Sequence, residues 1–91
     1  MSCPAFKVIY STHAEEDLRF WATSNKKTFK KIVFLLEEMM SSPYQGIGKP
    51  KPLRYEWSGC YSRRIDSKNR IVYKVNDEEK IIFVYMLRHH Y

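Results

Sequence analysis

Residues 49–74 read KPKPLRYEWSGCYSRRIDSKNRIVYK, and this stretch determines both the expected fold and the charge of the chain. Short runs of β-forming residues alternate with turn-like segments such as 58–59 and 66–69. Connections this short favour antiparallel neighbours, so we expect strands over 53–57, 60–65, 71–75 and, further on, 81–87. The stretch also holds eight Lys or Arg and two carboxylates, a surplus that equals the formal net charge of +6 for all 91 residues.

Upstream of this stretch, the sequence predicts one strand and two helices. Residues 6–10 are rich in β-forming residues. Thr12 is the expected N-cap of the first helix, with Glu15 three residues later, and this helix should end near residues 24–25. The second helix is expected over residues 26–40. Its apolar side chains recur at helical spacing and define the expected buried face: Phe29, Ile32, Val33, Leu36 and Met40.

The order strand, helix, helix and then several strands predicts an α+β fold. Two N-terminal helices should pack on one side of a twisted, mainly antiparallel sheet, in a single domain over residues 1–91. No apolar run approaches the roughly 20 residues that span a bilayer, and the N-terminus lacks a signal-peptide layout. Cys3 and Cys60 are interpreted as reduced thiols. We therefore expect a cytoplasmic protein that does not insert into a membrane.

The concentration of charge indicates a polyanionic partner. A basic surface interleaved with Tyr and Trp is typical of proteins that bind RNA or DNA phosphates. Four lysines of the second helix also gather at its N-terminal half, where the helix dipole disfavours positive charge. They form either a solvated face, the interpretation we prefer, or part of a partner-binding surface: Lys26, Lys27, Lys30 and Lys31.

The chemistry that these residue types allow is phosphodiester cleavage of RNA, which carries its own nucleophile in the 2′-hydroxyl. Such a site requires a proton acceptor, a cation for the charge that develops on the phosphate, and an acid for the leaving oxygen. Arg70 opens a strand, and the chain ends His89-His90-Tyr91. Arginine matches two phosphate oxygens and histidine titrates near neutrality. Each of these residues could instead be an ordinary surface residue.

Four motifs carry a resemblance to a known family. They are G-x-G-K-P-x-P-L at 46–53, W-S-G-x-Y-S-R-R-I at 57–65, N-R-I-V-Y at 69–73 and the terminal H-Y. Together they resemble the YoeB/Txe-type toxins of the RelE superfamily, which are ribosome-dependent messenger-RNA endonucleases of bacterial toxin–antitoxin pairs. The resemblance covers nearly the whole chain.

The resemblance implies a compact microbial-ribonuclease fold and cleavage of messenger RNA in the A site of the small ribosomal subunit, without metal or cofactor. It implies a cognate YefM/Phd-type antitoxin with an acidic C-terminal segment, and a homodimer is a further expected assembly. The implied catalytic residues are Arg70, with His90 as general acid, and Tyr91. The implied RNA-binding residues are Lys49, Arg54, Arg63 and Arg64, although adjacent strand residues point to opposite faces, so only one of the last two can join a shared site.

One position departs from the family pattern. The family has glutamate in K-P-E-P-L as the proposed base, and this chain has Lys51. Lys51 could serve as the base if neighbouring positive charges favour its neutral form, or it could clamp a phosphate. Glu56 is a possible substitute base. The departure also leaves open a catalytically weakened or inactive protein that only binds ribosome or antitoxin, and a third reading is a ribonuclease acting on free RNA.

Overall fold

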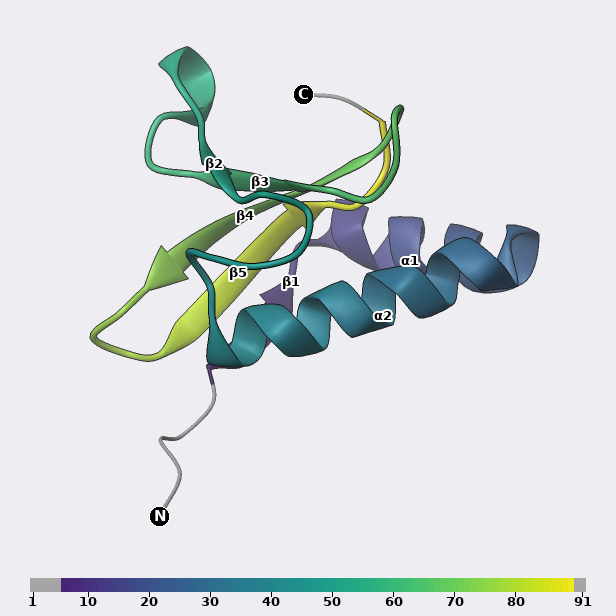
Figure 1. Cartoon of the computed structure of the whole chain (residues 1–91), viewed down its shortest axis with the longest axis horizontal. Coiled ribbons are helices and arrows are strands. Elements are labelled where there is room, and N and C mark those ends of the chain that lie inside the picture. Colours follow the sequence, from purple (N-terminus) through teal and green to yellow (C-terminus); the bar gives the residue numbers. More distant parts are fainter. Residues whose placement is uncertain (1–5, 90–91) are drawn as a thin grey trace.

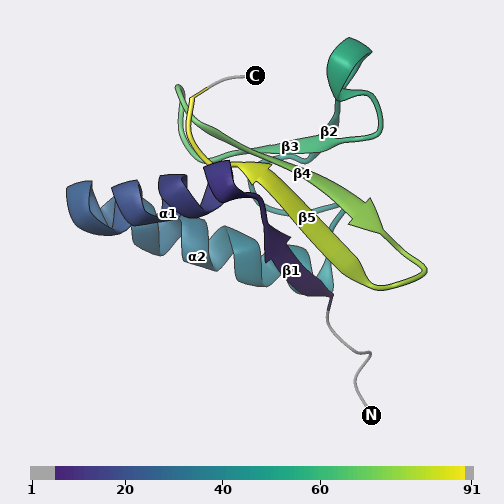
Figure 2. The ribbon, with the colours of Figure 1, turned by 180° about the vertical axis from the view of Figure 1, so that it is seen from behind.

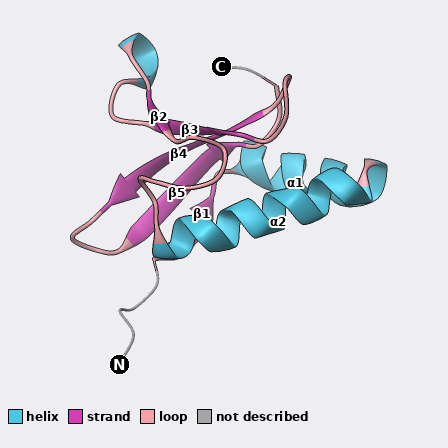
Figure 3. Ribbon diagram, in the orientation of Figure 1, coloured by secondary structure: helices cyan, strands magenta, loops and turns pink. Residues whose placement is uncertain are grey.

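The computed structural model describes residues 6–89 and shows two helices lying against one face of a five-stranded sheet (Figure 1, Figure 3). This arrangement confirms the predicted α+β class. The N-terminal helices and the sheet meet in one core. In chain order the elements are β1 (Lys7–Tyr10), α1 (Thr12–Ser24), α2 (Lys26–Ser41), β2 (Lys51–Pro52), the 3-10 turn η1 (Tyr55–Trp57), β3 (Tyr61–Arg64), β4 (Arg70–Asn76) and β5 (Ile81–Met86).

The sheet has the strand order β1-β5-β4-β3-β2. Three of its four pairings are antiparallel, as expected from the short connections. The exception is β1, which pairs in parallel with β5 at the sheet edge, where Lys7 lies opposite Ile81 and Tyr10 opposite Val84 (Figure 2). A parallel pair needs a long connection, and the helices and strands between β1 and β5 supply it. The prediction that residues 81–87 form an interior strand is therefore confirmed.

Helix α1 begins one residue earlier than predicted. Ser11, not Thr12, is the N-cap, because its hydroxyl accepts a hydrogen bond from the Ala14 N–H at 3.0 Å. Serine and threonine are both favoured N-cap residues, so either Ser11 or Thr12 could begin the helix on local sequence alone. Contact with the sheet decides between them, because the Ser11 N–H donates to the Val84 carbonyl at 2.9 Å and fixes Ser11 just before the helix starts.

Helix α2 begins at the predicted residue, but its buried face is rotated from the predicted one. Val33 is 37% exposed and Phe34 is 51% exposed. The apolar residues of this helix cover more than one face, so periodicity alone leaves the choice to packing against the sheet. The side chains that the sheet buries are Ile32, Leu35, Leu36 and Met39.

The two faces of the sheet are covered differently. Ile71 and Tyr73 of β4 pack into the main core with both helices. Between them, Val72 points to the other face and joins a small apolar cluster with Leu53 and Cys60. The predicted alternation along β4 is therefore confirmed, and the face away from the helices carries this small apolar cluster together with polar residues.

The predicted strand over 53–57 is wrong. Only Lys51–Pro52 pairs with β3, and the chain then turns into η1. The Leu53 N–H still donates to the Cys60 carbonyl at 2.9 Å, but the chain leaves the extended conformation at Tyr55, whose φ is 59°. The turn closes instead with bonds from the Trp57 N–H to the Arg54 carbonyl and from the Cys60 N–H to the Trp57 carbonyl.

Candidate functional site

The face of the sheet away from the helices carries a cluster of cationic and polar residues. In the register of β3 and β4, Arg64 lies opposite Arg70, and in that of β2 and β3, Lys51 lies opposite Ser62. Arg70 Nη1 donates to Ser62 Oγ at 3.4 Å, which directs the guanidinium towards β2. The structure thus brings Arg70, Arg64 and Lys51 onto one face, as a shared site requires.

The described chain ends beside Arg70. The Arg70 N–H donates to the His89 carbonyl at 3.2 Å, and the His89 N–H donates to Asn69 Oδ1 at 2.7 Å. His89 itself has a positive φ of 67°, a value that non-glycine residues adopt only where surrounding contacts hold them. His90 and Tyr91, two of the predicted catalytic residues, lie outside the described residues.

Helix α1 fixes the start of this C-terminal segment. Asp17 Oδ2 accepts a hydrogen bond from the Leu87 N–H at 2.9 Å, and Trp21 Nε1 donates to the Leu87 carbonyl at 2.8 Å. Asp17 is buried, and His13 Nε2 lies 3.4 Å from its carboxylate. Sequence reasoning missed Asp17, which is a charged residue on the buried face of an amphipathic helix and would have signalled a specific partner.

The turn between β3 and β4 is closed by its own carboxylate. Asp66 Oδ1 accepts bonds from the backbone N–H groups of Lys68 and Asn69 and from the Asn69 side chain. Burial alone would raise the pKa of Asp66, but these hydrogen bonds and the charge of Lys31 outweigh it and lower that pKa. The turn therefore holds Asn69 where it can accept from His89, a role that sequence reasoning missed.

The loop before β2 places the next predicted residues. Gly48 has a φ of +86°, and a Cβ there would lie 2.9 Å from the Arg64 carbonyl oxygen. This close approach lets the Gly48 carbonyl accept from the Arg64 N–H at 2.9 Å, so the loop is tied to β3. Lys49 and Arg54 are exposed on either side of β2 in the chain, as residues that contact RNA must be.

Arg63 does not belong to this surface, and its predicted RNA-binding role is corrected here. It is fully buried, on the opposite face of β3 from Arg64. Its Nη1 donates to Glu38 Oε1 at 3.1 Å and to the Ile47 carbonyl at 3.2 Å. Its other nitrogens donate to the Ser42 and Gln45 carbonyls and to the Tyr73 hydroxyl. With its donors used in this way, Arg63 ties the loop to α2 and the sheet.

The aromatic residues divide between core and surface. Tyr73 is buried and donates to the Pro43 carbonyl at 2.7 Å, and Tyr61 stacks on it. These two are sheet residues, as expected. Tyr55 was expected to be one too, but it lies in η1 with a φ of 59° and is 89% exposed. An aromatic ring this exposed beside Arg54 is available to stack on a base.

Two further residues considered from the sequence are Cys60 and Glu56. Cys60 is buried next to β3, and burial raises the pKa of its thiol despite the opposing charge of Lys74. Glu56 is exposed in η1. Within residues 6–89, His, Cys, Asp and Glu side chains nowhere gather as three possible metal ligands. No helix in that range is both long and apolar enough to cross a membrane.

Comparison with known proteins matches this chain to one family. Residues 10–91 match the model of the YoeB-like toxin of bacterial type II toxin–antitoxin systems. Toxin YoeB of Streptomyces coelicolor is 39% identical over 85 residues, which are 93% of this chain and 99% of the relative. The structure of a YoeB/ParE toxin from Agrobacterium tumefaciens superposes with a TM-score of 0.89 at 32% identity and covers 93% of this chain and 99% of that one.

Two structures from Staphylococcus aureus show relatives in assemblies. A YoeB–YefM complex has a TM-score of 0.84 at 37% identity and covers 94% of this chain and 98% of that one. A YoeB dimer has a TM-score of 0.85 at 35% identity, with 96% and 99% covered. The resemblance found in the sequence motifs is confirmed by these matches in both sequence and fold. This chain therefore belongs to the YoeB toxin family of bacterial type II toxin–antitoxin systems.

Proposed function

We propose that this toxin is an endoribonuclease that cuts messenger RNA in the ribosomal A site and so inhibits translation. The observation that carries the proposal is the position of Arg70. Its guanidinium lies on the exposed cationic face and contacts Ser62, while its backbone is bonded to the C-terminal segment at His89. A fixed cation next to the segment that leads to His90 and Tyr91 is the arrangement that general acid–base cleavage of a phosphodiester requires.

The proposed reaction uses the RNA's own 2′-hydroxyl. Its oxygen attacks the adjacent phosphorus and forms a 2′-O–P bond, while its proton passes to a base. The P–O5′ bond breaks, and His90 gives a proton to the leaving 5′-oxygen, so the products are a 2′,3′-cyclic phosphate and a 5′-hydroxyl. Arg70 stabilises the negative charge on the non-bridging oxygens. Tyr91 completes the catalytic group, and no metal or cofactor takes part.

Lys51 occupies the position from which the base would act. It lies in β2 opposite Ser62, the residue that Arg70 contacts, so it belongs to the same face of the sheet. We assign it to the catalytic group as base or phosphate clamp. Lys49, Arg54 and Arg64 are exposed around it and hold the RNA backbone on either side of the scissile phosphate.

The proposed partners follow from charge. A YefM/Phd-type antitoxin with an acidic segment would cover this cationic face and order on binding. The S. aureus relatives in complex with YefM and as a dimer support an antitoxin complex and a homodimer as assemblies for this chain. A toxin that acts on translating ribosomes is placed in the cytoplasm.

Primer extension on ribosome-bound message tests the proposal. The toxin should create new RNA ends at the A-site codon, and Arg70→Ala should abolish most of them. Lys74→Ala is the matched control, because Lys74 is an exposed cation on the same strand and face, about 13 Å along β4. It should leave cleavage near wild type. Stalled ribosomes without new ends would replace the nuclease by a binding protein, and cleavage of purified RNA would replace it by a free ribonuclease.

A further inference from the structure

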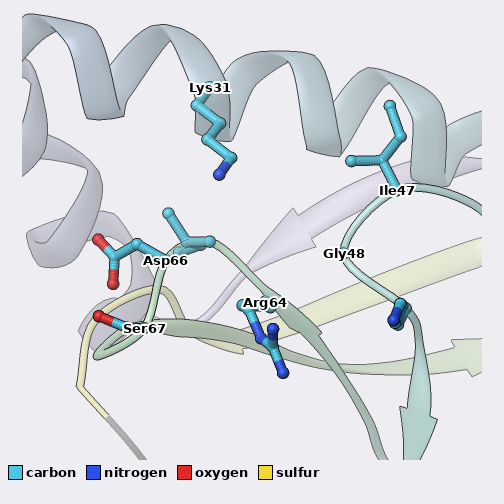
Figure 4. Close-up of a pocket in the computed structure, with 8 residues that line it drawn as sticks. Lys31, Ile47, Gly48, Arg64, Asp66 and Ser67 are labelled. Atoms are coloured by element: carbon cyan, nitrogen blue, oxygen red, sulfur yellow. The ribbon is translucent and has the colours of Figure 1, made fainter.

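A cationic depression lies at the end of β3, where α2, the loop 47–49 and the turn 64–67 meet. Its volume is about 320 Å³, and its walls carry Lys31, Lys49 and Arg64, with Asp66 and Ser67 at one end. Figure 4 shows Lys31 reaching from α2 towards the turn, while Arg64 lies at the far edge of the gap with its guanidinium pointing away from Lys31. Lys31 was interpreted from the sequence as part of a solvated face, so its place in this depression is new.

The three cations have no described carboxylate as an ion-pair partner. Over residues 6–89 the ion pairs are His13–Asp17 and Arg63–Glu38, which involve none of them. Asp66, the carboxylate at the rim, is already hydrogen-bonded to its own turn. Lys31 is near enough to Asp66 for its charge to lower the pKa of that carboxyl, but three cations against one carboxylate leave the lining of the depression with a net positive charge. A surface with a net positive charge attracts an anion.

The walls of the depression are fixed relative to one another. Glu38 of α2 accepts from Arg63 Nη1 at 3.1 Å and from the Ile47 N–H at 2.6 Å, so the helix, the loop and β3 are tied at one point. Gly48 and Arg64 add a bond at 2.9 Å. A cationic depression with rigid walls binds an anion without the cost of ordering the loop first.

Lys31 and its neighbour Lys30 face different surroundings. Lys31 precedes buried Ile32 and lies one turn before buried Leu35, so its side chain lies on the flank of α2 that turns to the sheet. Lys30 lies one turn before exposed Phe34 and does not line the depression. The two lysines therefore differ in position while both are exposed on the same helix.

We infer that this depression binds a phosphodiester group of the RNA strand adjacent to the one that Arg70 holds. The inference rests on the proposed function. Arg64 links the two positions, because it is paired with Arg70 in the sheet and also lines the depression. Its planar fork matches two phosphate oxygens, and the two lysines supply point charges. An RNA strand that leaves the scissile position over Arg64 meets Lys49 and then Lys31.

The test measures how the affinity for a single-stranded DNA oligonucleotide depends on KCl concentration. This probe carries the same phosphodiesters but no 2′-hydroxyl, so it cannot be cleaved. Each phosphate contact on a single strand contributes about 0.7 to the slope of log affinity against log salt. Lys31→Gln should reduce the slope by about that amount and weaken binding, whereas Lys30→Gln should leave the slope near wild type. Lys31→Arg should retain it.

Equal slopes for Lys31→Gln and Lys30→Gln, or no salt-dependent binding by the wild-type toxin, would overturn the inference. A competition between two polyanions, compared at equal concentrations of negative charge, gives a further outcome that would overturn the inference. If poly-glutamate displaces the oligonucleotide more effectively than poly-uridylate, the depression prefers a protein carboxylate. Failure of the proposed function gives a different pattern: the oligonucleotide slopes would hold as expected, while primer extension on ribosomes would find no new RNA ends.

Discussion

Asn69 Oδ1 accepts a hydrogen bond from the backbone N–H of His89 at 2.7 Å, and this bond joins the β3–β4 turn to the segment after β5. The same asparagine donates its side-chain N–H to Asp66. The turn is thus held at one end by its own carboxylate and holds the C-terminal segment at the other. Asn69 acts on the proposed site through the residues that it positions.

Replacement of this side chain is the first prediction. Asn69→Ala should reduce ribosome-dependent cleavage by about 10- to 100-fold, because small misplacements of catalytic groups have effects of that size. Asn76→Ala is the matched control, since Asn76 Oδ1 accepts from the Glu79 N–H at 3.0 Å in the other hairpin turn. Both variants should lose similar stability by urea unfolding. Equal cleavage by the two would remove Asn69 from its positioning role.

The buried guanidinium of Arg63 should be needed for folding and not for RNA contact. Arg63→Met leaves Glu38 and several backbone carbonyls without donors, a loss of about 3–5 kcal/mol in the free energy of unfolding. Arg64→Met, at the exposed neighbouring position, should change that free energy by about 0.5 kcal/mol or less while weakening RNA binding. Urea unfolding followed by tryptophan fluorescence measures the free energy of unfolding of each variant. A stable Arg63→Met protein would contradict this assignment.

The residue at position 51 should set the rate of proton removal from the 2′-hydroxyl. We expect Lys51→Glu to raise cleavage, because glutamate restores a base at this position, and general bases contribute about 10²- to 10⁴-fold. Lys51→Gln removes the charge without supplying a base and separates the two effects. Single-turnover cleavage on ribosomes is the measurement. If both variants are slower than wild type, Lys51 is itself a working group.

Asp66 should make part of the stability depend on pH. Its pKa in the folded chain lies below the ordinary value of 3.8, so its contribution is present above the unfolded value and is lost as pH falls through the folded value. The difference in urea midpoint between wild type and Asp66→Ala should therefore be constant near neutral pH and shrink in acid below 3.8. If the difference in urea midpoint grows on acidification instead, Asp66 does not stabilise the folded chain through its ionised carboxylate.

The sequence predicted the elements well where the signal is local. The meander from β3 to β5 follows from turn residues and alternation, and α2 begins at the predicted residue after Asn25. What local pattern could not settle was the choice between near-equivalent residues. Ser11 and Thr12 can both cap α1, and the bond from Ser11 to Val84 in β5 decides between them.

The same limit applies to the candidate site. Strand alternation shows that Arg63 and Arg64 face opposite ways, but it does not say which one is buried. The acceptors that select Arg63 come from α2 and from the loop after it, and they meet only in the folded chain. Lys31 presents the same difficulty, because only packing of α2 shows that it faces the end of β3 while Lys30 does not.

The strand order has a consequence for the synthesis of this toxin. Strand β5 follows every other described element in the chain, yet it lies between β1 and β4 and carries most of the contacts that α1 makes with the sheet. The nascent chain cannot assemble its sheet from the N-terminus onward, because β1 has no partner until β5 emerges. The sheet can therefore close only after β5 has been synthesised, because a nascent chain that stops before Ile81 lacks the strand that joins β1 to β4.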